Sequence, residues 1–172
     1  MITPNVLTSI RIGLVPPMIY SYLYMPKNGE TVAFFIFLFS ALTDVLDGYI
    51  ARRYNMITKL GTVLDPLADK MMLISVLTIF VISNKIKFWV LALMTFKEFL
   101  MILGAYFLYN NDDVVIPANI YGKISTLMFY LSGFAIMLDL QVGILLMNLF
   151  VFINIISLFI YFYRFVSVRG MI

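Results

Sequence analysis

The sequence predicts an all-α integral membrane protein with six transmembrane helices. Of its 172 residues, 63% are hydrophobic and 12% are charged, about half the charged fraction of an ordinary soluble domain. The apolar residues form runs of roughly 20, the length of a membrane-spanning helix, and only short polar breaks separate these runs. We therefore expect one membrane domain over residues 1–172.

The six expected helices follow from these runs in chain order. The first run ends at "PKNGE", the second at "RYNMITKLG", the third at "NKIK", the fourth at "NNDDVVIP" and the fifth at "DLQV". These polar breaks interrupt the apolar pattern, but none is long enough to be a domain linker. The expected spans are 5–25, 31–53, 62–84, 87–109, 119–140 and 142–164.

The distribution of basic residues predicts the orientation in the membrane. One side collects Arg11, Arg52, Arg53, Lys59, Lys123, Arg164 and Arg169, all counted as lying outside the membrane. The other side collects only Lys27, Lys85 and Lys87. The positive-inside rule places the first set and both termini in the cytoplasm, so we expect a multi-pass protein of the cytoplasmic membrane. The first run lacks the features of a cleavable signal and is expected to remain.

Composition also limits the chemistry. Cysteine and histidine are absent, which excludes disulfides, thiolate nucleophiles, zinc or iron–sulfur ligation and the most common general base. A metal ion would have to be bound by oxygen atoms. The net charge of +3 is too small for a nucleic-acid-binding surface, and no nucleic-acid partner is expected.

Four aspartates stand out in "TDVLDGYIARRYNMITKLGTVLDPLADK", residues 43–70. Asp44 and Asp47 are three residues apart near the end of the second span, and Asp65 and Asp69 are four apart near the start of the third. Each pair shares one helix face. At 1.5 Å per residue, all four lie roughly 6–14 Å inward from the expected cytoplasmic ends. The two polar faces can meet in a pocket just below that surface.

Charges at this depth require compensation. Each isolated carboxylate would cost at least ~2.5 kcal/mol in the membrane, and four of them would also repel one another. Hard divalent cations suit a purely oxygen donor set, and the pairing suggests two ions, Mg²⁺ or Mn²⁺, bridged by carboxylates. A structural role for all four aspartates is disfavoured by their cost, whereas Arg53, Lys59 and Lys70 can equally be solvated loop charges.

Small residues share the faces of the aspartates. Gly48 and Ala51 lie with the first pair and Gly61 with the second, within helical arcs of roughly 140° and 80°. Their small size lets a bulky ligand approach the backbone. Arg52, at the rim, can bind a phosphate group.

The aspartates, with these neighbours, carry a resemblance to a known family. The segment matches D-x2-D-G-x2-A-R-x8-G-x3-D-x3-D at every fixed position, and so resembles the signature of the CDP-alcohol phosphotransferases. The matching residues are Asp44, Asp47, Gly48, Ala51, Arg52, Gly61, Asp65 and Asp69. The length and the six-span plan are similar to that family as well.

The resemblance implies a reaction and a set of roles. Members transfer a phosphatidyl group from CDP-diacylglycerol, or a related CDP-alcohol, to an acceptor hydroxyl and release CMP. Asp44, Asp47 and Asp65 would then bind two divalent ions, and Asp69 would complete the metal site and act as general base. Gly48, Arg52 and Gly61 would line the nucleotide site. Family members are commonly homodimers, so a homodimer is expected within the lipid membrane.

The acceptor alcohol is less well defined. "TPNVLTSIR" resembles the "PNxLTxxR" opening of phosphatidylglycerophosphate synthases, whose acceptor is glycerol 3-phosphate, and its Asn5 and Thr8 would contact the nucleotide. Capping of the first helix by Thr3 or Asn5 is the alternative explanation. Lys123 and Lys97 are candidates for the acceptor phosphate, although Lys97 can instead pair with an aspartate or with its neighbour Glu98.

Three alternative functions remain. The fourth span has Lys97-Glu98 where phosphatidylglycerophosphate synthases usually have Arg-Glu, and lysine cannot form a bidentate fork. Cardiolipin synthases, which use phosphatidylglycerol as acceptor, are therefore a close alternative, with inositol-phosphate transferases a weaker third. A divalent-cation transporter could also hold paired carboxylates. Against it, the acidic residues gather toward one surface, and no polar path continues through the outer halves of the spans.

Overall fold

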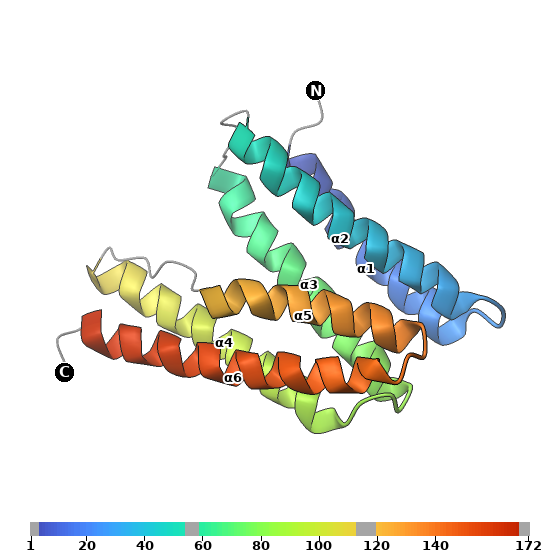
Figure 1. The fold of residues 1–172 in the computed structure, drawn as a ribbon. Coiled ribbons are helices and arrows are strands. Elements are labelled where there is room, and N and C mark those ends of the chain that lie inside the picture. The colour runs from blue at the N-terminus through green and yellow to red at the C-terminus, as the bar shows by residue number, and fades with distance from the viewer. Residues whose placement is uncertain (1–3, 54–58, 113–119, 169–172) are drawn as a thin grey trace. The chain divides into compact units, whose positions relative to one another are not determined.

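The computed structural model of the protein describes residues 4–53, 59–112 and 120–168, and these residues form six α-helices without a strand (Figure 1). The all-α prediction is confirmed. Side chains are not described at 4–5, 47, 49–52, 59–63, 105–112, 164–165 and 168. The helices are α1 (Pro4–Tyr24), α2 (Gly29–Arg53), α3 (Lys59–Ile82), α4 (Phe88–Asp112), α5 (Ile120–Met137) and α6 (Val142–Val168).

Three short connections reverse the chain with an Asn or Asp in the left-handed region. Asn28, Asn84 and Asp139 have φ of 58°, 57° and 53°, a conformation that Asn and Asp adopt more readily than other non-glycine residues. Schellman motifs end α3 and α5. In each, a backbone hydrogen bond closes a six-residue loop, from Lys85 N to Phe80 O and from Leu140 N to Ala135 O. The polar breaks of the sequence therefore act as helix stops.

Gly29 allows the tight turn between α1 and α2. A Cβ atom at this position would lie 2.2 Å from the backbone oxygen of Ser21, a distance that no real side chain tolerates. A larger residue would push the start of α2 away from α1. The glycine thus permits the close pairing of these two helices.

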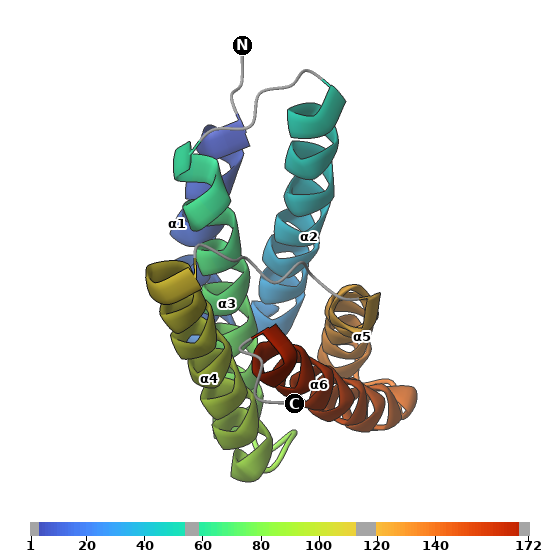
Figure 2. The same ribbon diagram turned by 90° about the vertical axis from the view of Figure 1, so that its left-hand side faces the viewer.

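The chain forms two compact units, Met1–Ile86 and Lys87–Ile172. In the first unit α1 packs against both α2 and α3. Its apolar core contains the fully buried side chains of Met18, Phe37, Val76, Leu77 and Phe80. The start of α1, the end of α2 and the start of α3 come to the same end of this unit (Figures 1 and 2). That end carries the acidic segment of the sequence.

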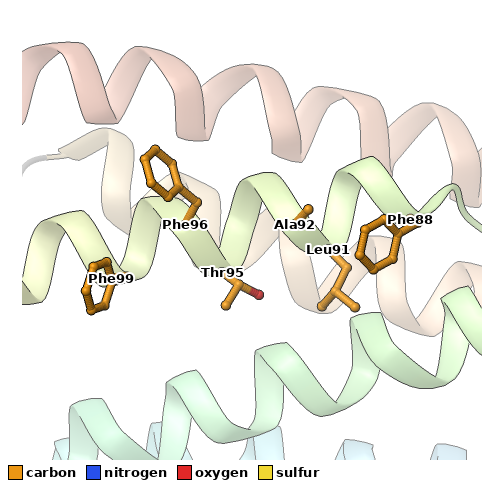
Figure 3. A pocket seen from close by; sticks show the side chains of 6 residues that line it. All are labelled: Phe88, Leu91, Ala92, Thr95, Phe96 and Phe99. Carbon is orange, nitrogen blue, oxygen red and sulfur yellow. The ribbon is translucent and has the colours of Figure 1, made fainter.

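In the second unit α6 packs against both α5 and α4. Phe129 of α5 and Phe150 of α6 place their ring centroids 5.7 Å apart, and Met147 is buried beside them on α6. One face of α4 lines a shallow apolar pocket of about 490 Å³ (Figure 3). Its lining residues are Phe88, Leu91, Ala92, Thr95, Phe96 and Phe99. A lining with so little polar character offers no catalytic group.

Four helices have stretches long and apolar enough to cross a membrane: Val6–Tyr24, Gly29–Leu46, Ile120–Met137 and Val142–Tyr163. Large apolar side chains are also exposed along them, as at Val45 and Phe159, where lipid would cover them. The protein is thus a multi-pass membrane protein. Spanning by α3 and α4, and hence the count of six, remains a prediction.

Candidate active site

The site begins with two polar residues on α1. Thr8 and Arg11 are three residues apart, so they share one helix face, and their exposed fractions are 0% and 2%. A buried arginine in a membrane helix requires compensating partners. Those partners lie on α2 and α3.

Arg11 joins three of the four predicted aspartates. Its Nη1 donates to Oδ1 of Asp69 at 2.8 Å and also to Oδ1 of Asp44. Its Nη2 lies 3.7 Å from Oδ1 of Asp65. Since Asp44 belongs to α2 and the other two belong to α3, one guanidinium connects three helices. Charge-assisted contacts of this kind are stronger than neutral hydrogen bonds.

Thr8 adds a neutral contact to the same cluster. Its hydroxyl donates to Oδ1 of Asp65 at 2.5 Å. The oxygen that faces Arg11 Nη2 is therefore also bound from one turn earlier on α1. The two residues thus both contact Asp65 from the buried side.

The carboxylates are more open than the residues beneath them. The side chains of Asp44, Asp65 and Asp69 are 27%, 44% and 42% exposed, whereas that of Arg11 is 2% exposed. The cluster thus has a cationic base and an acidic, accessible outer side. A cationic ligand would approach from that outer side.

The donor chemistry fits a hard divalent ion, because carboxylate oxygens from two helices gather at one accessible place. Among the described side chains, no three acidic groups are close enough to share one metal ion. Each of the three aspartates turns one oxygen toward Arg11 instead. Asp47, the fourth predicted ligand, is on α2, but its side chain lies outside the described part of the chain.

Comparison with known proteins identifies the family. The family model for CDP-alcohol phosphatidyltransferases matches residues 1–162. The chain belongs to the CDP-alcohol phosphatidyltransferase family. The resemblance noted in the aspartate signature is thereby confirmed, and the match also includes α1 with Thr8 and Arg11.

Relatives within the family carry two different names. Proteins of Bacillus subtilis and Aquifex aeolicus, both named CDP-diacylglycerol–glycerol-3-phosphate 3-phosphatidyltransferase, are 32% and 33% identical over 135 and 131 residues. These matches include 72% and 75% of this chain, and 69% and 71% of the relatives. A Mycobacterium bovis protein named, provisionally, as a cardiolipin synthase is 32% identical over 126 residues. That match includes 73% of this chain but only 59% of the mycobacterial protein.

The burial of Arg11 was not predicted from the sequence. Arg11 was counted among the cations outside the membrane, but its side chain is buried within the protein and bound to aspartates. The aspartate-bearing faces of α2 and α3 were predicted to meet each other. In the described part of this unit both helices pack mainly against α1, and Arg11 of α1 contacts aspartates on each of them. One signal was present: Arg11 is the final residue of the "PNxLTxxR" pattern that also contains Thr8.

The structure describes only some of the residues predicted to bind nucleotide. Thr8 is buried and bonded to Asp65, and Gly48 is partly exposed on α2. Asn5, Arg52 and Gly61 lie on α1, α2 and α3, but their side-chain positions lie outside the described part of the chain. Their roles remain predictions.

The two candidate acceptor lysines occur in different settings. Lys97 of α4 is buried, and its Nζ lies 2.7 Å from Oε1 of Glu98. The predicted alternative of pairing with Glu98 is therefore confirmed. Lys123, in the first turn of α5, is exposed. Of the two, Lys123 has its charge accessible to a ligand.

Proposed function

We propose that this protein transfers the phosphatidyl group of CDP-diacylglycerol to the hydroxyl of glycerol 3-phosphate. The gathering of Asp44, Asp65 and Asp69 around Arg11 is the observation that supports this function within the family. In the reaction the acceptor oxygen forms a bond to the lipid-bearing phosphorus, the bond from that phosphorus to CMP breaks, and the acceptor proton leaves. The Bacillus subtilis and Aquifex aeolicus relatives are named for this reaction.

Asp69 is our candidate general base. Its side chain is 42% exposed, so an acceptor hydroxyl can reach it, and a carboxylate in hydrogen-bonding reach of that hydroxyl can take its proton. Thr8 would position the neighbouring carboxylate of Asp65 from below.

We propose that Asp44, Asp47, Asp65 and Asp69 hold two divalent ions, Mg²⁺ or Mn²⁺. When bound, such ions would neutralise the charge on the pyrophosphate and the departing CMP. Gly48 and Gly61 would leave room for the cytidine diphosphate, with Asn5 and Thr8 nearby on α1. Arg52 would bind a phosphate at the rim.

Lys123 is the preferred ligand for the acceptor phosphate, because it is exposed whereas Lys97 is paired with Glu98. The alternative acceptor is phosphatidylglycerol, which would make the protein a cardiolipin synthase. The mycobacterial relative supports this alternative by its name. We further propose a location in the cytoplasmic membrane, an active site that faces the cytoplasm, and a homodimer.

Release of CMP from CDP-diacylglycerol tests these proposals. The purified protein would be assayed in lipid nanodiscs with Mg²⁺ or Mn²⁺, and glycerol 3-phosphate would be compared with phosphatidylglycerol. We expect release that depends on glycerol 3-phosphate. Release only with phosphatidylglycerol would establish a cardiolipin synthase instead. No release with either acceptor would contradict both and direct attention to other alcohols and to cation transport.

A further inference from the structure

Arg11 contacts one oxygen of each of three aspartates that are proposed to bind metal. One nitrogen, Nη1, binds Oδ1 of both Asp44 and Asp69, and Nη2 faces Oδ1 of Asp65. Three carboxylates contact this single guanidinium. Carboxylates gathered in this way attract cations, so a divalent ion and Arg11 would interact with the same groups.

We propose that Arg11 competes with divalent ions for Asp44 and Asp69. This inference rests on the proposed metal site. A doubly charged ion among these carboxylates repels a guanidinium at contact distance, so binding of metal displaces Arg11 from at least one aspartate. The affinity for metal is then set partly by the ion pairs that binding must break.

The arrangement has a consequence for the proposed base. The Nη1 atom lies 2.8 Å from Oδ1 of Asp69, so this oxygen is not open to an acceptor hydroxyl while the contact with Arg11 lasts. Displacement of the guanidinium would release Asp69 for the acceptor. Arg11 thus acts as a positioning residue that couples metal loading to the availability of the base.

An alternative role predicts the opposite effect. Arg11 could stay bound to one oxygen of each carboxylate and orient the other oxygen toward the metal, as outer-sphere partners commonly do. Its removal would then weaken metal binding. If the ion pairs of Arg11 were purely structural, their removal would reduce stability and leave metal affinity unchanged. The direction of the change in metal affinity therefore discriminates among the three roles.

The test is Mn²⁺ binding by calorimetry to the full-length protein after removal of metal with chelator. We expect Arg11→Gln to bind Mn²⁺ about tenfold more tightly than the wild type, because metal binding no longer has to break an ion pair between Arg11 and an aspartate. Its metal-free form should also unfold at a lower temperature, and Mn²⁺ should raise that temperature by more than in the wild type. Arg11→Lys keeps the charge but loses the fork geometry, so a smaller gain in affinity, about threefold, is expected.

Lys85→Gln provides the matched control, since it removes the same charge from a partly exposed pair with Glu30, 3.9 Å apart. Its Mn²⁺ affinity should equal that of the wild type. Unchanged or weaker binding in both Arg11 variants would overturn the inference, and Arg11→Lys alone decides the matter if Arg11→Gln does not fold. Failure of the wild-type protein to bind either Mn²⁺ or Mg²⁺ would overturn the metal site itself, and this inference with it.

Discussion

The two units of the chain use buried polar residues in different ways. In the first, Arg11 binds Asp44 and Asp69, which lie 33 and 58 positions away in the sequence and on two other helices. In the second, Lys97 pairs with the adjacent Glu98. One contact between helices there, from the amide nitrogen of Asn154 on α6 to the hydroxyl of Ser125 on α5, is neutral.

This difference indicates where the chemistry lies. The Asn154–Ser125 bond and the Lys97–Glu98 pair each join two polar side chains in largely buried surroundings. Such contacts are typical of helix packing within membranes. Asp44, Asp65 and Asp69 of the first unit have side chains that are 27–44% exposed, and all three contact one guanidinium. The first unit therefore contains the proposed reactive groups, while the described polar contacts of the second support its fold.

Asp69→Asn should give the largest effect and thus tests the assignment of the first unit most directly. Loss of the general base should lower turnover by about 10²–10⁴-fold, while CDP-diacylglycerol still binds. CMP release and substrate binding measure the two quantities separately. Asp139→Asn is the control, because it removes the same charge at an exposed turn where Asn keeps the left-handed conformation. Retained turnover in Asp69→Asn would remove Asp69 as the base.

Lys123→Gln tests whether the second unit also contributes to the reaction. If Lys123 binds the acceptor phosphate, the KM for glycerol 3-phosphate should rise about tenfold, the scale of one charge-assisted contact. Steady-state kinetics with varied glycerol 3-phosphate measures this change. Lys97→Gln is the comparison: because Lys97 is paired with Glu98, its KM should change much less. The reverse order would assign the phosphate to Lys97.

Asn154→Leu should produce the smallest effect, on stability alone. It removes the bond to Ser125 and should reduce the free energy of unfolding by about 1 kcal/mol, with turnover per folded molecule unchanged. Unfolding in detergent and CMP release measure the two quantities. Asn148→Leu, at an exposed position of the same helix, should not reduce stability. A loss of turnover in Asn154→Leu would mean that the polar groups of the second unit do more than hold helices together.

Much of the fold followed from local pattern. The expected spans 31–53 and 142–164 agree closely with α2 (Gly29–Arg53) and α6 (Val142–Val168), since apolar run length determines what can be buried in lipid. The aspartates were found because carboxylates at helical spacing are costly in such runs. Asp47, Arg52 and Gly61 remain predictions, as their side chains lie outside the described part of the chain.

Arg11 shows what local pattern could not provide. By sequence it resembled the other basic residues used to predict orientation, because a charge near a helix end is most often solvated. Arg11 is buried because α1 packs against both α2 and α3, and this packing could not be predicted from the local sequence. Lys97 is the contrasting case: its partner is the next residue, so the pairing could be foreseen.

The class of the protein, its helices and its acidic signature could be predicted from the residues alone, because hydrophobicity and helical period act over short stretches of chain. Which charges meet depends instead on how the helices pack. Asp44, Asp65 and Asp69 share a guanidinium only through the packing of three helices, and the energy of an ion pair depends on distance and burial rather than on sequence separation.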